Sequence, residues 1–143
     1  MKKALILSVM VMFSFFAVGS AIAKPAKCPQ KRSTKSAPGS IAKKDKTAKA
    51  NKANGKKLFM KTAKPMACQM CHGPKGDGGG KLGAALKPKP RNFACAPTMK
   101  KVSAGQMFHV IKNGSKGTGM AKQKLSDKEI WDVIKYIRED LMK

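Results

Sequence analysis

The most regular pattern of hydrophobic and polar positions lies near the end of the chain. Apolar residues recur there at i, i+3, i+4, i+7 and i+11, namely at Ile130, Val133, Ile134, Ile137 and Leu141. This spacing places them on one face of an α-helix. The S-x-x-E sequence from Ser126 to Glu129 comes just before them and is typical of a capping box at a helix start. The pattern predicts an amphipathic C-terminal helix with one buried face.

Two shorter segments also have helical spacing. Residues 54–62 predict a short helix with Leu58 and Phe59 as apolar anchors, and residues 103–113 predict a helix that stops at Gly114. Residues 81–101 contain three prolines and are expected to be irregular. No stretch alternates long enough to predict a strand. We therefore expect an all-α fold of short helices and long loops. Long loops in a compact domain are typical of proteins in which the loops surround a bound group.

The N-terminal residues have the pattern of an export signal. Two lysines precede an apolar run from Ala4 to Ala23, which ends in the small-residue pattern Ala-Ile-Ala. Residues 1–23 are therefore predicted to be a signal peptide. The apolar run is also about long enough to span a bilayer, so an uncleaved anchor is the alternative. Both interpretations place the rest of the chain outside the cytoplasm, and we expect a periplasmic location.

The next segment, residues 24–50, differs in composition from the remainder of the chain. It contains nine Lys or Arg residues and one acidic residue, Asp45, with no apolar periodicity. Such a segment cannot bury much apolar surface and repels itself, so the sequence predicts a disordered lysine-rich tail. The folded domain is then expected over residues 51–143.

The net charge of the chain indicates which classes of partner it could bind. The chain has 31 Lys and Arg residues against 7 Asp and Glu residues, a formal net charge of +24. An anionic partner is expected, which could be a protein, a lipid surface or a nucleic acid. No DNA-binding helix motif or basic–aromatic alternation is present, and the chain has an export signal, so we expect no nucleic acid. The tail could contact an anionic membrane surface.

The sequence Cys68-Gln69-Met70-Cys71-His72 carries the chemistry. It is a C-x-x-C-H motif, the attachment site of a c-type haem. One helical turn brings the two thiols to one haem edge, where they add to the vinyl groups as thioethers, and the histidine can then ligate the iron. A zinc site would need a second cysteine pair, which Cys28 and Cys95 do not form. A thioredoxin-like pair would need a βαβ context.

The second axial ligand of the iron is predicted from the methionines. Met120 closes the glycine loop that begins at Gly117, has no helical apolar neighbours and can reach over a haem face. A thioether ligand is common in electron-transfer haems. Met107 lies on an apolar helix face and is expected to pack. Met99, His109 and an open iron site are the alternatives.

Four ordered pieces together resemble the class I monohaem c-type cytochromes. They are G-x-x-L-F (Gly55 to Phe59), C-x-x-C-H-G with its glycine loop (Cys68 to Gly80), G-x-G-M (Gly117 to Met120), and the C-terminal helix (Leu125 to Arg138). The resemblance implies a cytochrome c fold around one covalently attached haem c. It implies a one-electron carrier, not an enzyme, with Cys68, Cys71, His72 and Met120 as the binding residues.

The resemblance implies further contacts. The first and last helices of such proteins cross, which would bring Gly55 and Phe59 against the region of Trp131, Ile134 and Tyr136. The loop with Arg91 and Asn92 could bond a haem propionate. Lysines around the haem edge would steer acidic redox partner proteins toward what we expect to be a monomer. Membership of a larger oxidoreductase complex, as its haem c subunit, is the alternative function.

Two features depart from the family pattern. Met120 is followed by Ala121 where many relatives have proline, so its loop is expected to be looser. Cys28 and Cys95 are additional cysteines. In an oxidising compartment they could form a disulfide, and free or intermolecular thiols are the alternative.

Overall fold

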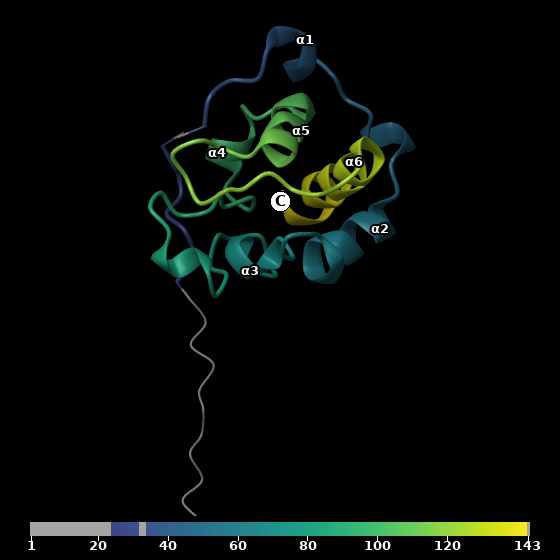
Figure 1. Cartoon of the computed structure of the whole chain (residues 1–143). Helices are drawn as coiled ribbons and strands as arrows, with labels where there is room; N and C mark the ends of the chain where they lie inside the picture. Colours follow the sequence, from purple (N-terminus) through teal and green to yellow (C-terminus); the bar gives the residue numbers. More distant parts are fainter. Residues whose placement is uncertain (1–23, 32–33, 143) are drawn as a thin grey trace, which may run out of the picture.

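The structure, a computed structural model, describes residues 24–31 and 34–142 (Figure 1). Its α-helices are α1 (Gly39–Ala42), α2 (Lys52–Lys57), α3 (Gln69–His72), α4 (Ala96–Met99), α5 (Ala104–Asn113) and α6 (Asp127–Tyr136). The 3-10 turns are η1 (Thr47–Lys49) and η3 (Gly83–Ala85), and the π-helical turns η2 (Leu58–Thr62) and η4 (Ile137–Leu141) extend α2 and α6. No strand occurs in these residues, and the prediction of an all-α fold is confirmed.

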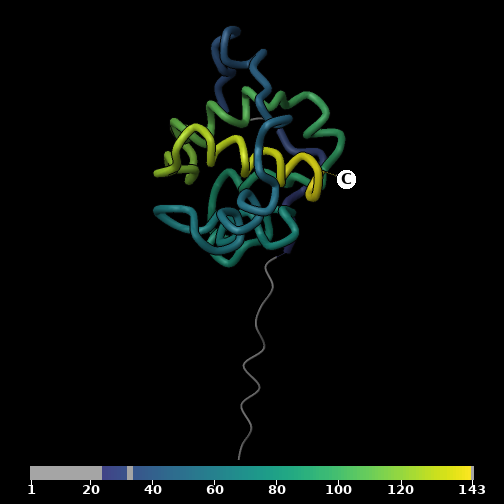
Figure 2. Tube along the Cα trace, turned by 90° about the vertical axis from the view of Figure 1, so that its right-hand side faces the viewer, coloured from purple at the N-terminus to yellow at the C-terminus, as the bar shows by residue number. Residues whose placement is uncertain are grey.

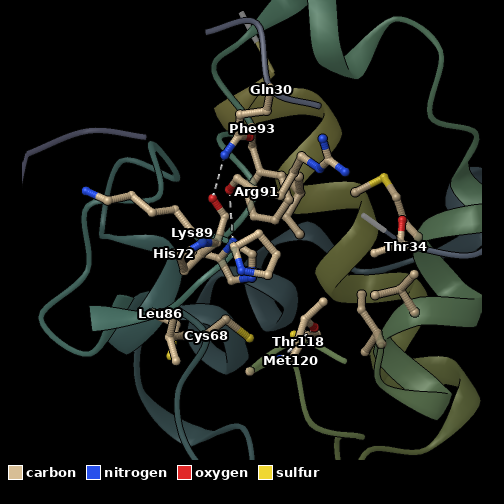
Figure 3. A pocket seen from close by; sticks show the side chains of 18 of the residues that line it. Gln30, Thr34, Cys68, His72, Leu86, Lys89, Arg91, Phe93, Thr118 and Met120 are labelled. Carbon is tan, nitrogen blue, oxygen red and sulfur yellow. Dashed lines mark hydrogen bonds between the residues drawn. The ribbon is translucent and has the colours of Figure 1, made fainter. Parts of the chain in front are cut away.

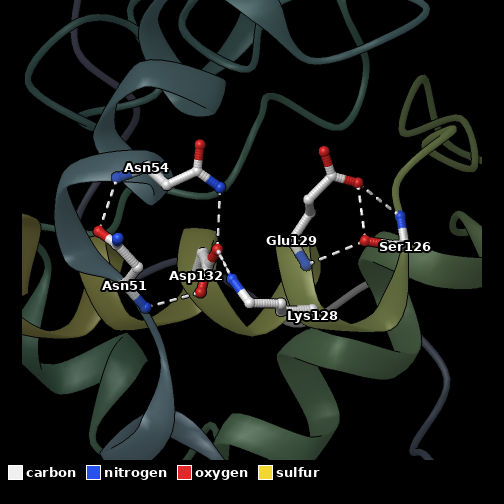
Figure 4. Close-up of polar contacts among 6 residues, drawn as sticks. All are labelled: Asn51, Asn54, Ser126, Lys128, Glu129 and Asp132. Atoms are coloured by element: carbon white, nitrogen blue, oxygen red, sulfur yellow. Dashed lines mark hydrogen bonds and ion pairs between the residues drawn. The ribbon is translucent and has the colours of Figure 1, made fainter.

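Helix α6 lies between α2 and α5 and carries much of the core. Its capping box is formed: the Glu129 backbone N–H donates to Ser126 Oγ at 3.3 Å, and the Ser126 backbone N–H donates to Glu129 Oε2 at 2.8 Å (Figure 4). The predicted apolar face is buried, and its fully buried members include Ile130 and Ile134. Helix α5 is capped by Ser103, whose hydroxyl accepts from the Gln106 N–H. Local sequence signals therefore predicted both helices.

Helices α2 and α6 cross at Gly55. A Cβ at this position would lie 1.9 Å from the Asp132 carbonyl oxygen, so only glycine permits the approach. Beside the crossing, the Asp132 carboxylate accepts from Asn51 N–H at 2.6 Å and from Asn54 Nδ2 at 2.9 Å (Figure 4). A buried carboxylate needs such donors. The crossing expected from the family resemblance is thus present.

Aromatic contacts fill the space around this crossing. The rings of Phe59 and Tyr136 lie 5.5 Å apart, as the resemblance implied for this region. Trp131 has a different neighbour, because it stacks on Phe108 of α5 at 4.7 Å between ring centroids. The two helices that flank α6 are therefore each joined to it by an aromatic pair.

Residues 24–31 and 34–50, which we call the N-terminal strap, differ from the disordered tail that the sequence predicted for this part of the chain. In Figure 1 the strap runs from the lower left of the domain over its top, through α1, and down to α2, and Figure 2 shows the same path from the side. A disulfide joins Cys28 to Cys95. Ala26 and Ala37 are buried, while the described strap lysines are exposed.

The physical reason for this difference is that hydrogen bonds of backbone groups and polar side chains, together with one cross-link, hold the strap, and not an apolar face. The Ala26 N–H donates to the Asp77 carbonyl at 2.8 Å, and Ser103 Oγ donates to the Ala42 carbonyl at 2.7 Å. Such bonds can form with any side chain, so the composition of the strap did not reveal them.

The predicted signal peptide or anchor, residues 1–23, lies outside the described residues. None of the helices within residues 24–31 and 34–142 has the length and apolar character needed to cross a bilayer.

Candidate haem site

Helix α3 places the two motif cysteines one turn apart. The His72 N–H donates to the Cys68 carbonyl at 2.9 Å, which closes this turn. Neither Cys68 nor Cys71 is in a disulfide, and both are half-buried. Gly80 then passes so close to the turn that a Cβ there would lie 2.5 Å from the Met70 carbonyl oxygen. The glycine loop after the motif therefore folds back onto the cysteines.

Burial keeps both motif thiols protonated. It raises the pKa of Cys68 to about 11, and it also raises the pKa of Cys71. A neutral thiol is a poor metal ligand, because the thiolate is the form that binds metals. A thioether sulfur carries no charge, so this half-buried place tolerates a thioether better than a thiolate.

The His72 ring is held on two sides. Its Nδ1 lies 3.0 Å from the Arg91 carbonyl oxygen, and its ring stacks on Phe93 with 4.6 Å between centroids and 17° between planes. A carbonyl can only accept, so Nδ1 carries the proton and Nε2 keeps its lone pair. Burial lowers the pKa of His72, which favours the neutral imidazole. Nε2 is therefore available as a metal ligand.

Met120 approaches the same space from the other end of the chain. Its N–H donates to Thr118 Oγ1 at 3.2 Å, and its carbonyl accepts from the Ser115 N–H at 2.8 Å, which shapes the loop before α6. A Cβ on Gly119 would lie 2.7 Å from the side chain of Leu86, so this loop also packs closely against η3. Figure 3 shows the side chains of Met120, Cys68 and His72 around one hollow.

The four residues predicted to bind haem all line one cavity of about 600 Å³. Such a volume is typical of sites for cofactors and other small molecules. Most of the lining is apolar, with side chains from η2, α5, α6 and the loops, among them Phe59, Leu82, Leu86, Val110, Ile111 and Val133. The cavity thus brings together residues 68–72 and residue 120, which are far apart in the sequence.

The alternatives for the second axial ligand lie elsewhere or in the core. His109 is not among the described lining residues, and its Nδ1 lies 3.2 Å from Asn113 Nδ2. Met99 borders the cavity but is only 2% exposed and belongs to the hydrophobic core. Met107 is also a core residue, as the apolar face of α5 predicted.

The polar lining fits the two carboxylates of a haem. Four cationic residues border the cavity, namely Lys27, Lys31, Lys89 and Arg91, and its described lining contains no Asp or Glu. The apolar walls, the C-x-x-C-H turn and the cationic side of the cavity together fit a haem group.

One side of the cavity was missed by sequence reasoning. The strap contributes Lys27, Gln30, Lys31 and Thr34 to the lining. The only sequence signal for this was the additional cysteine pair. Asn92, expected near a propionate, has its side chain committed to the strap, because Nδ2 donates to the Ala26 carbonyl at 3.1 Å. Arg91 remains at the cavity.

Comparison with known proteins agrees with this geometry. A cytochrome c family model matches residues 52–139. No curated protein matches the sequence. A solved chain of the reducing HAO-like protein complex of Kuenenia stuttgartiensis has a similar fold, with a TM-score of 0.50 and 23% identity. The match covers 62% of this chain but only 41% of that one.

A second solved structure is similar over more of its own length. It is the c-type cytochrome SorU from Sinorhizobium meliloti, with a TM-score of 0.43 and 22% identity. The match covers 64% of this chain and 91% of that one. The family match begins at residue 52, so it includes neither the strap nor residues 1–23.

Proposed function

The chain belongs to the cytochrome c family, and on that premise we propose that it is a periplasmic one-electron carrier with a single haem c. Membership of the family implies haem-based electron transfer and a covalently bound haem c. We propose that Cys68 and Cys71 form the two thioethers and that His72 and Met120 are the axial ligands. The observation that carries this proposal is that all four residues line one apolar cavity.

The residues of the chain have distinct roles in this proposal. When bound, the haem supplies an iron that accepts and returns one electron. Cys68 and Cys71 keep the group from dissociating. His72 offers Nε2 because its Nδ1 proton is held by the Arg91 carbonyl. The Met120 thioether, a soft ligand, favours the reduced state. If His72 and Met120 both ligate the iron, a substrate would have no place to bind there, as is expected of a carrier and not of an enzyme.

Met120→Ala tests the second axial ligand. The oxidised wild-type protein should show a methionine-to-iron charge-transfer band, and its haem should remain with the protein through acid–acetone extraction. Met120→Ala should lose the band and bind CO or cyanide readily, because one axial position is then open.

Met66→Ala is a matched control, because Met66 lines the same cavity but is 43% exposed. It should keep the wild-type spectrum. An unchanged spectrum in Met120→Ala would show that another residue is the ligand. Extraction of the haem from the wild-type protein would show that the cysteines do not hold it covalently.

The distribution of charge supports an acidic redox partner. Five of the 7 acidic residues lie between positions 127 and 140, on α6 and η4. The cavity side is cationic, and Met66 and Leu82 are exposed apolar residues there. A partner with an acidic face would be steered to this side. The rate of electron exchange with an acidic redox protein should fall as salt rises, and a rate independent of salt would argue against such steering.

The disulfide supports the proposed location. Disulfides persist in oxidising compartments such as the bacterial periplasm. Fractionation of cells that express the full chain should place the haem protein in the periplasmic extract or at the membrane. Its native mass there distinguishes a monomeric carrier from a subunit of a larger oxidoreductase complex.

A further inference from the structure

Gln30 of the strap makes two hydrogen bonds to one short backbone segment beside the haem site. Its Nε2 donates to the Pro90 carbonyl at 3.0 Å, and its Oε1 accepts from the Asn92 N–H at 2.8 Å. The two bonds therefore hold the backbone on both sides of Arg91. Gln30 itself is fixed by the disulfide at Cys28, two residues earlier, and by its own N–H, which donates to Thr98 Oγ1 at 2.9 Å.

The segment that Gln30 holds is the one that orients His72. The Arg91 carbonyl accepts from His72 Nδ1 at 3.0 Å, and Figure 3 shows Gln30 beside Arg91 and His72 with this bond drawn. The Arg91 C=O and the Asn92 N–H belong to the same planar peptide group. Fixing the direction of the Asn92 N–H therefore also fixes the direction of the carbonyl that receives the His72 proton.

We propose that Gln30 is a positioning residue that sets the orientation and donor strength of His72 through the Arg91–Asn92 peptide. This inference rests on the proposed role of His72 as an iron ligand. A peptide whose N–H donates a hydrogen bond has a more negative carbonyl oxygen, which accepts more strongly. A stronger bond from Nδ1 makes Nε2 a better donor to a metal, and better donation stabilises the oxidised state. The strap thus tunes a site built mainly by residues 52–139, the part of the chain that the family model matches.

The chain provides a matched control for this contact. Gln106 of α5 makes the same pair of bonds to the strap: its Oε1 accepts from the Ala37 N–H at 2.7 Å, and its Nε2 donates to the Lys35 carbonyl at 3.1 Å. Gln106 also lines the cavity. Both side-chain hydrogen bonds of Gln106 end at the backbone of the strap. Those of Gln30 end at the backbone on either side of Arg91, whose carbonyl accepts from His72. Gln30→Leu and Gln106→Leu therefore remove equivalent pairs of side-chain hydrogen bonds, with different consequences for His72.

Three measurements on the purified haem protein test the proposal. In the reduced protein, Gln30→Leu should speed hydrogen exchange of the Asn92 amide about tenfold, because a net hydrogen bond is lost, and should shift the NMR signal of the His72 ring N–H. Its reduction potential should rise relative to wild type. Gln106→Leu should leave the Asn92 exchange rate and the His72 signal near their wild-type values.

Gln30→Glu provides a second variant that keeps the side-chain size and an acceptor for the Asn92 N–H. It loses the Nε2 donor to the Pro90 carbonyl, but it should retain the slow Asn92 exchange, also if Gln30→Leu does not fold. The proposal would be overturned by fast Asn92 exchange in Gln30→Glu, or by equal effects of Gln30→Leu and Gln106→Leu on the Asn92 exchange rate and the His72 signal. These outcomes concern Gln30 alone, whereas loss of the haem–methionine band on Met120→Ala tests the proposed function independently.

Discussion

Replacing Gly55 with alanine should force helices α2 and α6 apart. The new Cβ would lie 1.9 Å from the Asp132 carbonyl oxygen, 2.4 Å from its carbonyl carbon and 3.0 Å from the Val133 nitrogen. Ordinary contacts begin at 3.4 Å, so α2 and α6 would have to separate by about 1.5 Å. All three atoms belong to the backbone of α6, so a side-chain rotation cannot relieve the clash.

The cost of this separation can be estimated from the contacts it disturbs. Overpacking of this kind costs about 1–3 kcal/mol. The same movement stretches the bonds from Asn51 and Asn54 to the Asp132 carboxylate, and hydrogen bonds to charged groups contribute about 1.5–3 kcal/mol. The better helix propensity of alanine offsets about 1 kcal/mol. We expect a net loss of about 3 kcal/mol, a large share of the usual stability of a small domain.

Urea unfolding followed by far-UV circular dichroism measures this loss. Gly39→Ala is the matched control, because Gly39 also lies in a short helix, α1, but a Cβ there would meet nothing within 4 Å. The control should be neutral or slightly stabilising, by up to about 1 kcal/mol. If Gly55→Ala lost less than about 0.5 kcal/mol, within the usual range of surface substitutions, the tight crossing would be refuted.

Three further outcomes are expected. Replacing Cys28 and Cys95 by serine should lower the unfolding free energy by about 4 kcal/mol, because the disulfide closes a loop with a sequence separation of 67; a loss under about 1 kcal/mol in urea would contradict this. Burial raises the pKa of Asp132, but hydrogen bonds led by that from Asn54 outweigh it and hold the pKa below its usual value. Stability should therefore fall as pH drops below about 4, and less steeply in Asp132→Asn; equal slopes would exclude this carboxylate as a cause. Phe93→Ala removes a buried ring and should lower stability by about 3–5 kcal/mol in thermal unfolding, whereas an unchanged melting temperature would show that the ring is not a packing element.

Local signals predicted the regular elements of the chain well. The capping box and apolar stripe predicted α6 and its extension η4, and the C-x-x-C-H sequence predicted a helical turn that opens into a glycine loop. Each of these signals depends on residues a few positions apart, so these elements can be predicted from the sequence without knowledge of the tertiary contacts. The short helix α4 was missed, because Pro97 lies in its first turn, where proline is tolerated.

The candidate site could be described only from the sequence and the tertiary structure together. The sequence named Cys68, Cys71, His72 and Met120 as binding residues, and the structure places all four around one cavity. Their roles toward a haem remain predictions that the spectrum and Met120→Ala test. The sequence could not indicate that the Arg91 backbone would receive the His72 proton, because a carbonyl is present at every position.

The sequence by itself determined the all-α fold, the order of the haem-attachment motif and the methionine loop, and the excess of positive charge. Only the tertiary structure decided where the strap lies, that Cys28 meets Cys95, and that Gln30 holds the peptide beside His72. The physical reason is the range of the forces involved. Helix periodicity and capping act within a few residues, whereas the strap is held by a cross-link and by hydrogen bonds from side chains to backbone carbonyls 60 or more positions away.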